Sequence, residues 1–251
     1  MAEYDPFFRE KLFDIIKYPE SISIYSVIIE LIVYTITALL IYHGYKTMGK
    51  KKIILFFTGT LLSTLLMENF WIIFGYQSQY IEGWPRNYYY NFHTYIFWII
   101  AVPVIVVCAW FILIYSSGQI AEQAISTGKL KKALTASVIG TTIDLVIDPI
   151  VIRRYAWLWL KERDETLWIL QVPSTNFIGW FIIVATFNYF FVWYWSKFMG
   201  KHENWDLLKT GAFFYMFVIG VLLFTLLLTL GFAILLIPFY GVDLSWWAWP
   251  Y

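Results

Sequence analysis

Residues 207–240 read LLKTGAFFYMFVIGVLLFTLLLTLGFAILLIPFY, and Lys209 is the only charged side chain among them. A helix needs about 20 consecutive apolar residues to cross a bilayer core of about 30 Å. This stretch is long enough to cross with a tilt, or with a break near Gly231 or Pro238. It therefore predicts a transmembrane helix and decides the fold class of the chain.

Five more apolar runs of similar length precede this one. They extend approximately over residues 22–45, 53–75, 94–116, 130–152 and 172–198. Of the 251 residues, 60% are hydrophobic and only 14% are charged, which is too few to coat a soluble protein of this length. We therefore expect one all-α transmembrane domain over residues 1–251, a polytopic bundle of about six spans, multi-pass in the cell membrane. No internal repeat is evident.

The N-terminal segment mixes acidic and basic side chains from the start, unlike the basic start of a cleavable signal peptide. We expect the first span to insert uncleaved. Residues 6–18 place phenylalanine, leucine and isoleucine among charges, which predicts a short interfacial helix on the membrane surface.

Lysines concentrate in three of the connections between spans, which predicts that these connections share one side of the membrane, expected to be cytoplasmic. They are Lys46, Lys50, Lys51, Lys52, Lys129, Lys131, Lys132, Lys197, Lys201 and Lys209. The net charge of +1 gives no indication of a nucleic-acid partner. Membrane lipid is the expected surrounding.

Several classes of site lack support in the sequence. Cys108 is the single cysteine, and the three histidines are not spaced as metal ligands. No dinucleotide, P-loop or nucleophile-elbow motif occurs. We expect neither a metal nor an organic cofactor.

Four ionisable side chains lie inside predicted spans, where each costs on the order of 3 kcal/mol. They are Glu30, Glu68, Asp144 and Asp148. Counting about 1.5 Å of rise per residue from the non-cytoplasmic end of each span places all four at depths of about 6 to 12 Å. Acids from separate spans are therefore expected to share one leaflet, although Glu30 alone suits a structural role.

Asp144 and Asp148 are four residues apart, so they project from one face of a helix. One of the two is expected to hold its proton at neutral pH, because low dielectric and a like-charged neighbour both disfavour a second ionised carboxyl. A protonated carboxyl in an apolar pocket is a good general acid. Pro149 follows and leaves a backbone carbonyl near Leu145 without its helical partner, which predicts a polar notch beside the acids.

The next span carries Asn176 and Trp180 at the same level, four residues apart on one face. The loops on this side are rich in tyrosine and tryptophan, which suits either an aromatic belt at the lipid headgroups or the lining of a substrate site. The polar side chains within the spans are equally compatible with a purely structural role, in which they hydrogen-bond to one another and stabilise the helix bundle.

The stretch TIDLVIDP at residues 142–149, followed by Trp157, Trp159 and VPSTNFIGWF at residues 172–181, resembles the archaeal and bacterial carotenoid biosynthesis membrane proteins. That family includes bisanhydrobacterioruberin hydratase and γ-carotene 1′-hydratase. Glu68, the tyrosines at 88–90, and the Val102–Pro103 dipeptide that leads to Trp110 and Tyr115 fit the same pattern, so the resemblance covers roughly residues 60 to 185.

The resemblance implies a hydro-lyase, a carotenoid hydratase that adds water across a terminal isoprenoid double bond of a linear carotenoid. Protonation of a trisubstituted alkene gives a tertiary carbocation, which needs a desolvated acid, aromatic faces and one controlled water. We expect one residue of the Asp144–Asp148 pair to donate the proton, and the other to orient the water together with Glu68. Asn176 is their expected hydrogen-bonding partner. The residues expected to contact the lipid-soluble substrate are Trp180, Tyr90, Trp157, Trp159 and Phe177.

Three other readings stay open at this stage. An intramembrane prenyltransferase would use paired aspartates to hold Mg²⁺ against a diphosphate, although only one such motif is present. A carotenoid end-group cyclase shares the protonation step and excludes water. A structural or pigment-binding subunit, associated with other membrane proteins, would fit the aromatic content equally well.

Overall fold

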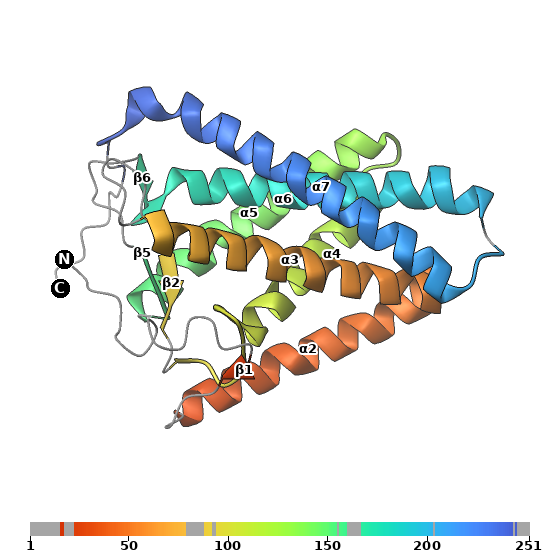
Figure 1. Ribbon diagram of the computed structural model, residues 1–251, viewed down its shortest axis with the longest axis horizontal. Coiled ribbons are helices and arrows are strands. Elements are labelled where there is room, and N and C mark those ends of the chain that lie inside the picture. The colour runs from red at the N-terminus through yellow and green to blue at the C-terminus, as the bar shows by residue number, and fades with distance from the viewer. Residues whose placement is uncertain are drawn as a thin grey trace.

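A computed structural model describes residues 16–17, 23–78, 88–91, 94–154, 156–159, 167–202, 204–242 and 244. Within these residues six helices are long and apolar enough to cross a membrane, so the chain is an all-α helical bundle and a multi-pass membrane protein, as predicted. The helices are α2 (Ile24–Met48), α3 (Lys50–Ser78), α4 (Val104–Ala124), α5 (Lys129–Arg153), α6 (Ser174–Trp193) and α7 (Leu207–Leu235). Figure 1 shows α3 and α6 running along the length of the molecule, with α2 and α7 inclined to them.

Three helix boundaries differ from the predicted spans because prolines and short strands lie near them. Helices α4 and α6 begin later than expected, since Pro103 and Pro173 are their N-cap residues and the residues before each proline are extended. Helix α7 ends at Leu235, and Pro238 lies in the 3₁₀ turn Ile237–Phe239 that follows. A π-helical turn, Tyr194–Phe198, continues α6.

Helix α2 distributes its polar and apolar side chains in the opposite way to a helix of a soluble protein. Its buried residues are the polar or small Ser26, Glu30, Thr37 and Gly44, whereas most of its large apolar side chains are exposed. Exposed apolar side chains face hydrocarbon in a membrane, while small and polar residues make contacts between helices. Figure 1 shows α2 meeting α3 at the lysine-rich end and diverging from it towards the other end.

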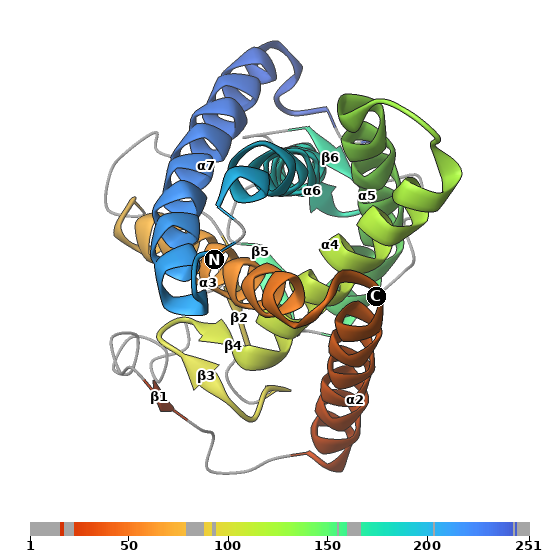
Figure 2. The same ribbon diagram turned by 90° about the vertical axis from the view of Figure 1, so that its right-hand side faces the viewer.

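Helices α3, α4, α6 and α7 lie around the centre of the bundle when it is viewed along its length (Figure 2). Helix α5 packs most extensively on α6 and also on α4, and α2 packs on α3 and α4. Phe56 of α3 anchors the apolar core of the bundle through edge-to-face contacts with Phe111, Tyr115, Phe187 and Phe191.

Short strands form small sheets at the end opposite the lysine-rich turns, which the prediction of helices alone did not include. Strands β3 (Trp98–Ile99) and β4 (Val102–Pro103) form one antiparallel hairpin, and β6 (Trp168–Ile169) and β7 (Val172–Pro173) form another. Strand β2 (Tyr88–Tyr90) pairs antiparallel with β5 (Trp157–Trp159), so segments distant in sequence lie side by side. In Figure 1, strands β2, β5 and β6 lie at the left-hand end of the bundle, where α3 ends and α6 begins.

The predicted interfacial helix at residues 6–18 falls mostly outside the described residues. Its described part, β1 (Ile16–Lys17), is a strand that pairs with β3 and is not helical. Backbone pairing with a neighbouring strand supplies hydrogen bonds that the amphipathic pattern of side chains does not reveal.

Candidate active site

Asp144 and Asp148 lie one turn apart on α5 and are 0% and 1% exposed. The side-chain amide of Asn176, on the neighbouring α6, donates to Asp144 Oδ2 at 3.1 Å and to Asp148 Oδ2 at 2.5 Å. The two carboxyl groups also lie close enough to interact with each other directly. One amide therefore holds a pair of acids together at the interface of α5 and α6.

Each carboxyl of this pair keeps one oxygen without a partner. Asp144 Oδ1 and Asp148 Oδ1 are buried, and within the described residues no group outside the pair donates a hydrogen bond to either. Buried polar atoms in native proteins are nearly always paired with protein or with water, so these two oxygens are where the proton shared by the pair, and a polar guest, are expected to bind. Pro149 lies inside α5 directly after Asp148, where the helix lacks one backbone donor.

Glu68 of α3 has a different environment. Its Oε1 accepts a hydrogen bond from Trp110 Nε1 at 2.8 Å, and its Oε2 accepts hydrogen bonds from Tyr90 Oη at 2.9 Å and from Tyr88 Oη. Three donors therefore hold this carboxyl in one orientation. Glu68 also interacts electrostatically with Asp144 and Asp148, which places all three acids in one region of the bundle.

The tyrosines reach Glu68 because of strand geometry. Alternate residues of a strand point to the same face, so Tyr88 and Tyr90 of β2 both extend towards α3. The pairing of β2 with β5 brings Trp159 onto Tyr88, with ring centroids 4.8 Å apart, and Trp157 onto Tyr90 at 5.7 Å. Burial raises the pKa of both tyrosines well above the usual value, so they remain hydrogen-bond donors.

Two stacked tryptophans join the acidic regions. Trp110 of α4 and Trp180 of α6 stack with ring centroids 4.0 Å apart and an interplanar angle of 19°. Trp110 donates to Glu68, and Trp180 lies one helical turn beyond Asn176, which holds the aspartates. Direct contacts thus join Glu68 to Trp110 and Trp110 to Trp180, and helix α6 carries both Trp180 and the Asn176 that binds the aspartates.

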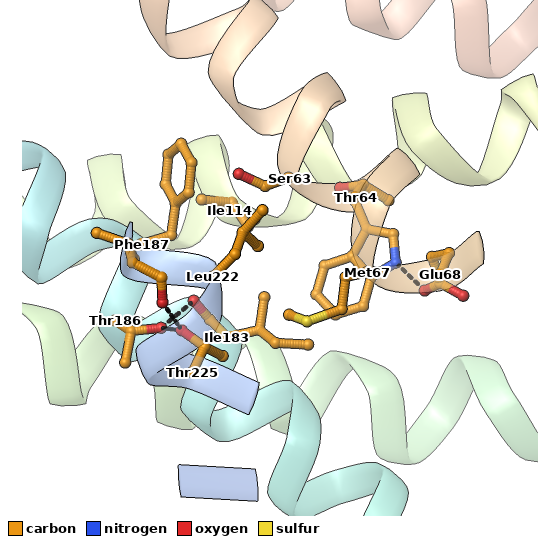
Figure 3. Close-up of a pocket in the computed structure, with 12 residues that line it drawn as sticks. Ser63, Thr64, Met67, Glu68, Ile114, Ile183, Thr186, Phe187, Leu222 and Thr225 are labelled. Atoms are coloured by element: carbon orange, nitrogen blue, oxygen red, sulfur yellow. Dashed lines mark hydrogen bonds between the residues drawn. The ribbon is translucent and has the colours of Figure 1, made fainter. Parts of the chain in front are cut away.

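A narrow cavity of about 20 Å³ lies between α3, α4, α6 and α7, with Glu68 at one end (Figure 3). Its lining includes Trp110 but neither aspartate. The wall is mostly apolar in effect, because the hydroxyls of Ser63, Thr186 and Thr225 donate to backbone carbonyls of their own helices. Such a wall suits an apolar guest.

The structure gathers the predicted site residues at the end of the bundle that carries the strands, with the three acids, Asn176, Trp180, Tyr90, Trp157 and Trp159 in the arrangement above. Phe177 is buried next to Asn176 on α6. Trp159 Nε1 is a further buried atom without a partner. Glu30 stands apart, since it accepts hydrogen bonds from Tyr34 Oη and the Ile96 amide, each at 2.6 Å.

Two residues of this arrangement, Trp110 and Tyr88, are absent from the predicted site. The signal for Tyr88 is its position two residues before Tyr90, since both fall on one face of a strand. The signal for Trp110 is the WFI tripeptide that it begins, which occurs again at Trp180.

The fold and these contacts define a class of protein: a multi-pass membrane protein with a buried acidic site under an aromatic layer. In the described ranges, no three His, Cys, Asp or Glu side chains converge as a metal site requires. The model of one family, described as carotenoid biosynthesis protein, matches residues 25–244. The chain belongs to this family, which assigns it a role in carotenoid biosynthesis. Comparison with curated proteins and with solved structures gives no match.

Proposed function

We propose that this protein is a carotenoid hydratase, which adds water across a terminal isoprenoid double bond of a linear carotenoid. The observation that carries the proposal is the Asp144–Asp148 pair, buried and held by Asn176, with one oxygen on each carboxyl that no group outside the pair contacts as a donor within the described residues. Family membership supports the substrate class, a lipid-soluble polyene. The site of action is the cell membrane.

The reaction needs one proton and one water. Two carboxyls this close are most stable together when one is protonated, so the pair supplies a single acidic proton. That proton adds to the less substituted carbon of the double bond, and the positive charge develops on the tertiary carbon. A water attacks this carbon through its oxygen and loses a proton to the carboxylate that the first transfer left behind. The products are a tertiary alcohol and the original acid pair.

Aromatic rings beside the acids suit the cationic intermediate. Indole faces stabilise positive charge, and the indole of Trp180 lies one helical turn beyond Asn176, whose amide holds the aspartates. The layer of Tyr90, Trp157 and Trp159 covers the same end of the bundle and limits the entry of bulk water. The apolar cavity at Trp110 has room for about one water at its volume of about 20 Å³, so it would have to widen to receive part of the isoprenoid chain.

Expression in a lycopene-producing host tests the proposal. The expected product is a pigment heavier by one water, formed by the wild-type chain and lost in Asp144→Asn and Asp148→Asn. Glu30→Gln is the matched control, because Glu30 is another buried membrane carboxyl that lies outside the site. Its product yield should equal that of the wild type.

Other outcomes would replace the proposal with a different function. A product isomeric with lycopene would identify a cyclase. A product heavier by a prenyl group, formed only with Mg²⁺, would identify a prenyltransferase. Unchanged pigment that copurifies with the chain would identify a binding subunit, and full hydration by both aspartate variants would remove the acid pair from the mechanism.

A further inference from the structure

The sequence leading into α4 occurs a second time at the start of α6. Seven residues of the first copy recur 70 positions later, in the same order and with the same spacing. They are Trp98, Ile99, Val102, Pro103, Trp110, Phe111 and Ile112, which match Trp168, Ile169, Val172, Pro173, Trp180, Phe181 and Ile182. The expectation that the chain has no internal repeat is therefore wrong.

The two copies have the same backbone structure. In each hairpin the tryptophan pairs with the proline and the isoleucine with the valine. The Val104 amide donates to Phe97 O, and the matching Ser174 amide donates to Leu167 O, both at 2.8 Å. The turn residue Ile100 has a φ of 57°, and its counterpart Leu170 has a φ of 51°. This agreement in detail indicates an internal duplication.

The duplicated unit includes the helix before each hairpin. The first unit comprises α3, β2, β3, β4 and α4, and the second comprises α5, β5, β6, β7 and α6. Each hairpin gains a third backbone partner from one end of the chain. Strand β1 pairs with Trp98 of the first hairpin, and in the second Trp168 exchanges backbone hydrogen bonds with Val242 and Leu244, at 2.9 and 2.8 Å.

Matching elements of the two units touch each other. Strand β2 pairs with its counterpart β5, and Trp110 stacks on its counterpart Trp180. Contact of a surface with its own copy is the mark of a two-fold arrangement. The stacked tryptophans therefore lie where the two units meet, and both units share them.

The polar positions of the two units are not alike. Gly49 and Gly128, with φ of 84° and 92°, precede α3 and α5, and Asn69 and Asp148 each lie 20 residues after their glycine. Asn69 is satisfied within its own unit, since it donates to Leu65 O and accepts from the Ala101 amide, each at 2.8 Å. Asp148 instead has an oxygen to which no group outside the acid pair donates among the described residues. We call the first unit closed, because its polar side chain at this level has its hydrogen-bonding partners within the unit, and we call the second unit open, because an oxygen of Asp148 is left for a guest.

We propose that Glu68, which belongs to the closed unit, is a positioning residue. It holds Trp110 in place, and through the stacked pair it holds Trp180 beside the open aspartate site of the other unit. The inference rests on the proposed hydratase function for its effect on rate. Glu68 is suited to this role because three donors fix its carboxyl, and one of them is the indole N–H of Trp110. The role differs from the orientation of the reacting water expected from the sequence.

The test compares Glu68→Gln, Glu68→Leu and Trp110→Phe in purified protein. Two stacked indoles couple in circular dichroism and give a paired positive and negative band, which Trp110→Phe should abolish and so identify. Glu68→Leu removes the acceptor of Trp110, so the paired band should weaken and kcat should fall about 10²-fold. Glu68→Gln keeps an oxygen acceptor without the charge, so it should restore the band and bring kcat to within about tenfold of the wild type.

Two results would overturn the inference. One is a Glu68→Gln protein with the paired band intact and turnover as low as that of Asp148→Asn, which would place Glu68 in the chemistry. The other is a Glu68→Leu protein with wild-type band and rate. The paired circular-dichroism band is measured without substrate, so it is informative even if the protein is not a hydratase. If Glu68→Leu fails to fold, Trp110→Phe removes the same hydrogen bond between Glu68 and the indole of Trp110.

Discussion

Replacing Asn176 by leucine is the sharpest test of the acid pair. Leucine has nearly the same shape as asparagine but cannot donate a hydrogen bond. The change removes the bonds of 3.1 and 2.5 Å to Asp144 and Asp148 and leaves both carboxyls in place. It therefore separates the arrangement of the acids from their presence.

The magnitude follows from the two lost hydrogen bonds. A bond to an ionised carboxyl contributes about 1.5–3 kcal/mol, and about 1.4 kcal/mol of transition-state stabilisation is a factor of ten in rate. Only the gain in bond strength between the resting state and the transition state affects the rate. The bond to the carboxyl that gives up its proton gains about 1.4 kcal/mol as that carboxyl becomes ionised, so hydration should slow by about tenfold without it. The free energy of unfolding should fall by about 2–3 kcal/mol, because two more acceptor atoms become unsatisfied and protonation relieves part of the cost.

The assay measures hydrated pigment per folded protein in membranes, with chemical unfolding in detergent as the measure of stability. Asn188→Leu is the matched control, since Asn188 is another buried amide on α6 and its amide donates to Val184 O at 3.0 Å. It should lower stability by about 1 kcal/mol and leave hydration at the wild-type rate. A wild-type rate in Asn176→Leu would refute the view that the amide organises the acids.

Three further changes test other parts of the structure. Gly59→Val should lower the free energy of unfolding, measured by chemical unfolding, by about 1–3 kcal/mol. The reason is that a Cβ at Gly59 would lie 2.5 Å from the ring of Phe214 and push α7 away from α3. An unchanged free energy of unfolding would contradict this packing. Tyr88 and Tyr90 should stay un-ionised in the folded protein near pH 10.0, where exposed tyrosines titrate, because burial raises the pKa of each. Since their folded-state pKa values exceed the unfolded ones, the free energy of unfolding should fall as the pH rises past the unfolded pKa of tyrosine. Phenolate absorbance of Tyr88 and Tyr90 that appears together with that of the exposed tyrosines would be the contrary result. Ser63→Leu narrows the apolar cavity and should raise KM for the carotenoid by about tenfold with little change in kcat, while an unaltered KM would place the substrate chain elsewhere.

The spans were predictable because hydrophobic length is a local property of the sequence, whereas the common depth of the acids stays a prediction. Hydrophobic length is read directly from residues such as 207–240, and depth follows from a constant rise per residue. In the part of the chain that the structure describes, six helices long and apolar enough to cross a membrane accordingly follow the predicted order, and Glu68 lies within electrostatic reach of Asp144 and Asp148.

The hairpins were not predictable by the same means. Trp98–Pro103 consists of apolar residues that continue into an apolar helix, so hydrophobicity alone extends the span backwards to Thr94. Only the proline marks a boundary there. In the same way, the contact of Trp110 with Trp180 depends on how each helix is rotated about its axis, and depth carries no information about rotation.

The partners of Glu68 illustrate a third limit. Tyr88 and Tyr90 look like part of an aromatic belt when only composition is considered, and their extended backbone is set by pairing with β5, about 70 residues away in the chain. Long-range strand pairing left no periodic signal in so short a segment. The alternation of the two tyrosines was nevertheless present in the sequence.

The length of α7 has a consequence for how the surrounding lipid acts on the protein. Its 29 residues extend for about 44 Å, compared with a hydrocarbon core of about 30 Å, and the helix crosses the bundle obliquely (Figure 1). A thinner bilayer favours a stronger tilt of such a helix, and a thicker one a more upright position. Because α7 also contributes Val221, Leu222 and Thr225 to the cavity wall, membrane thickness becomes a variable that acts on the shape of the cavity.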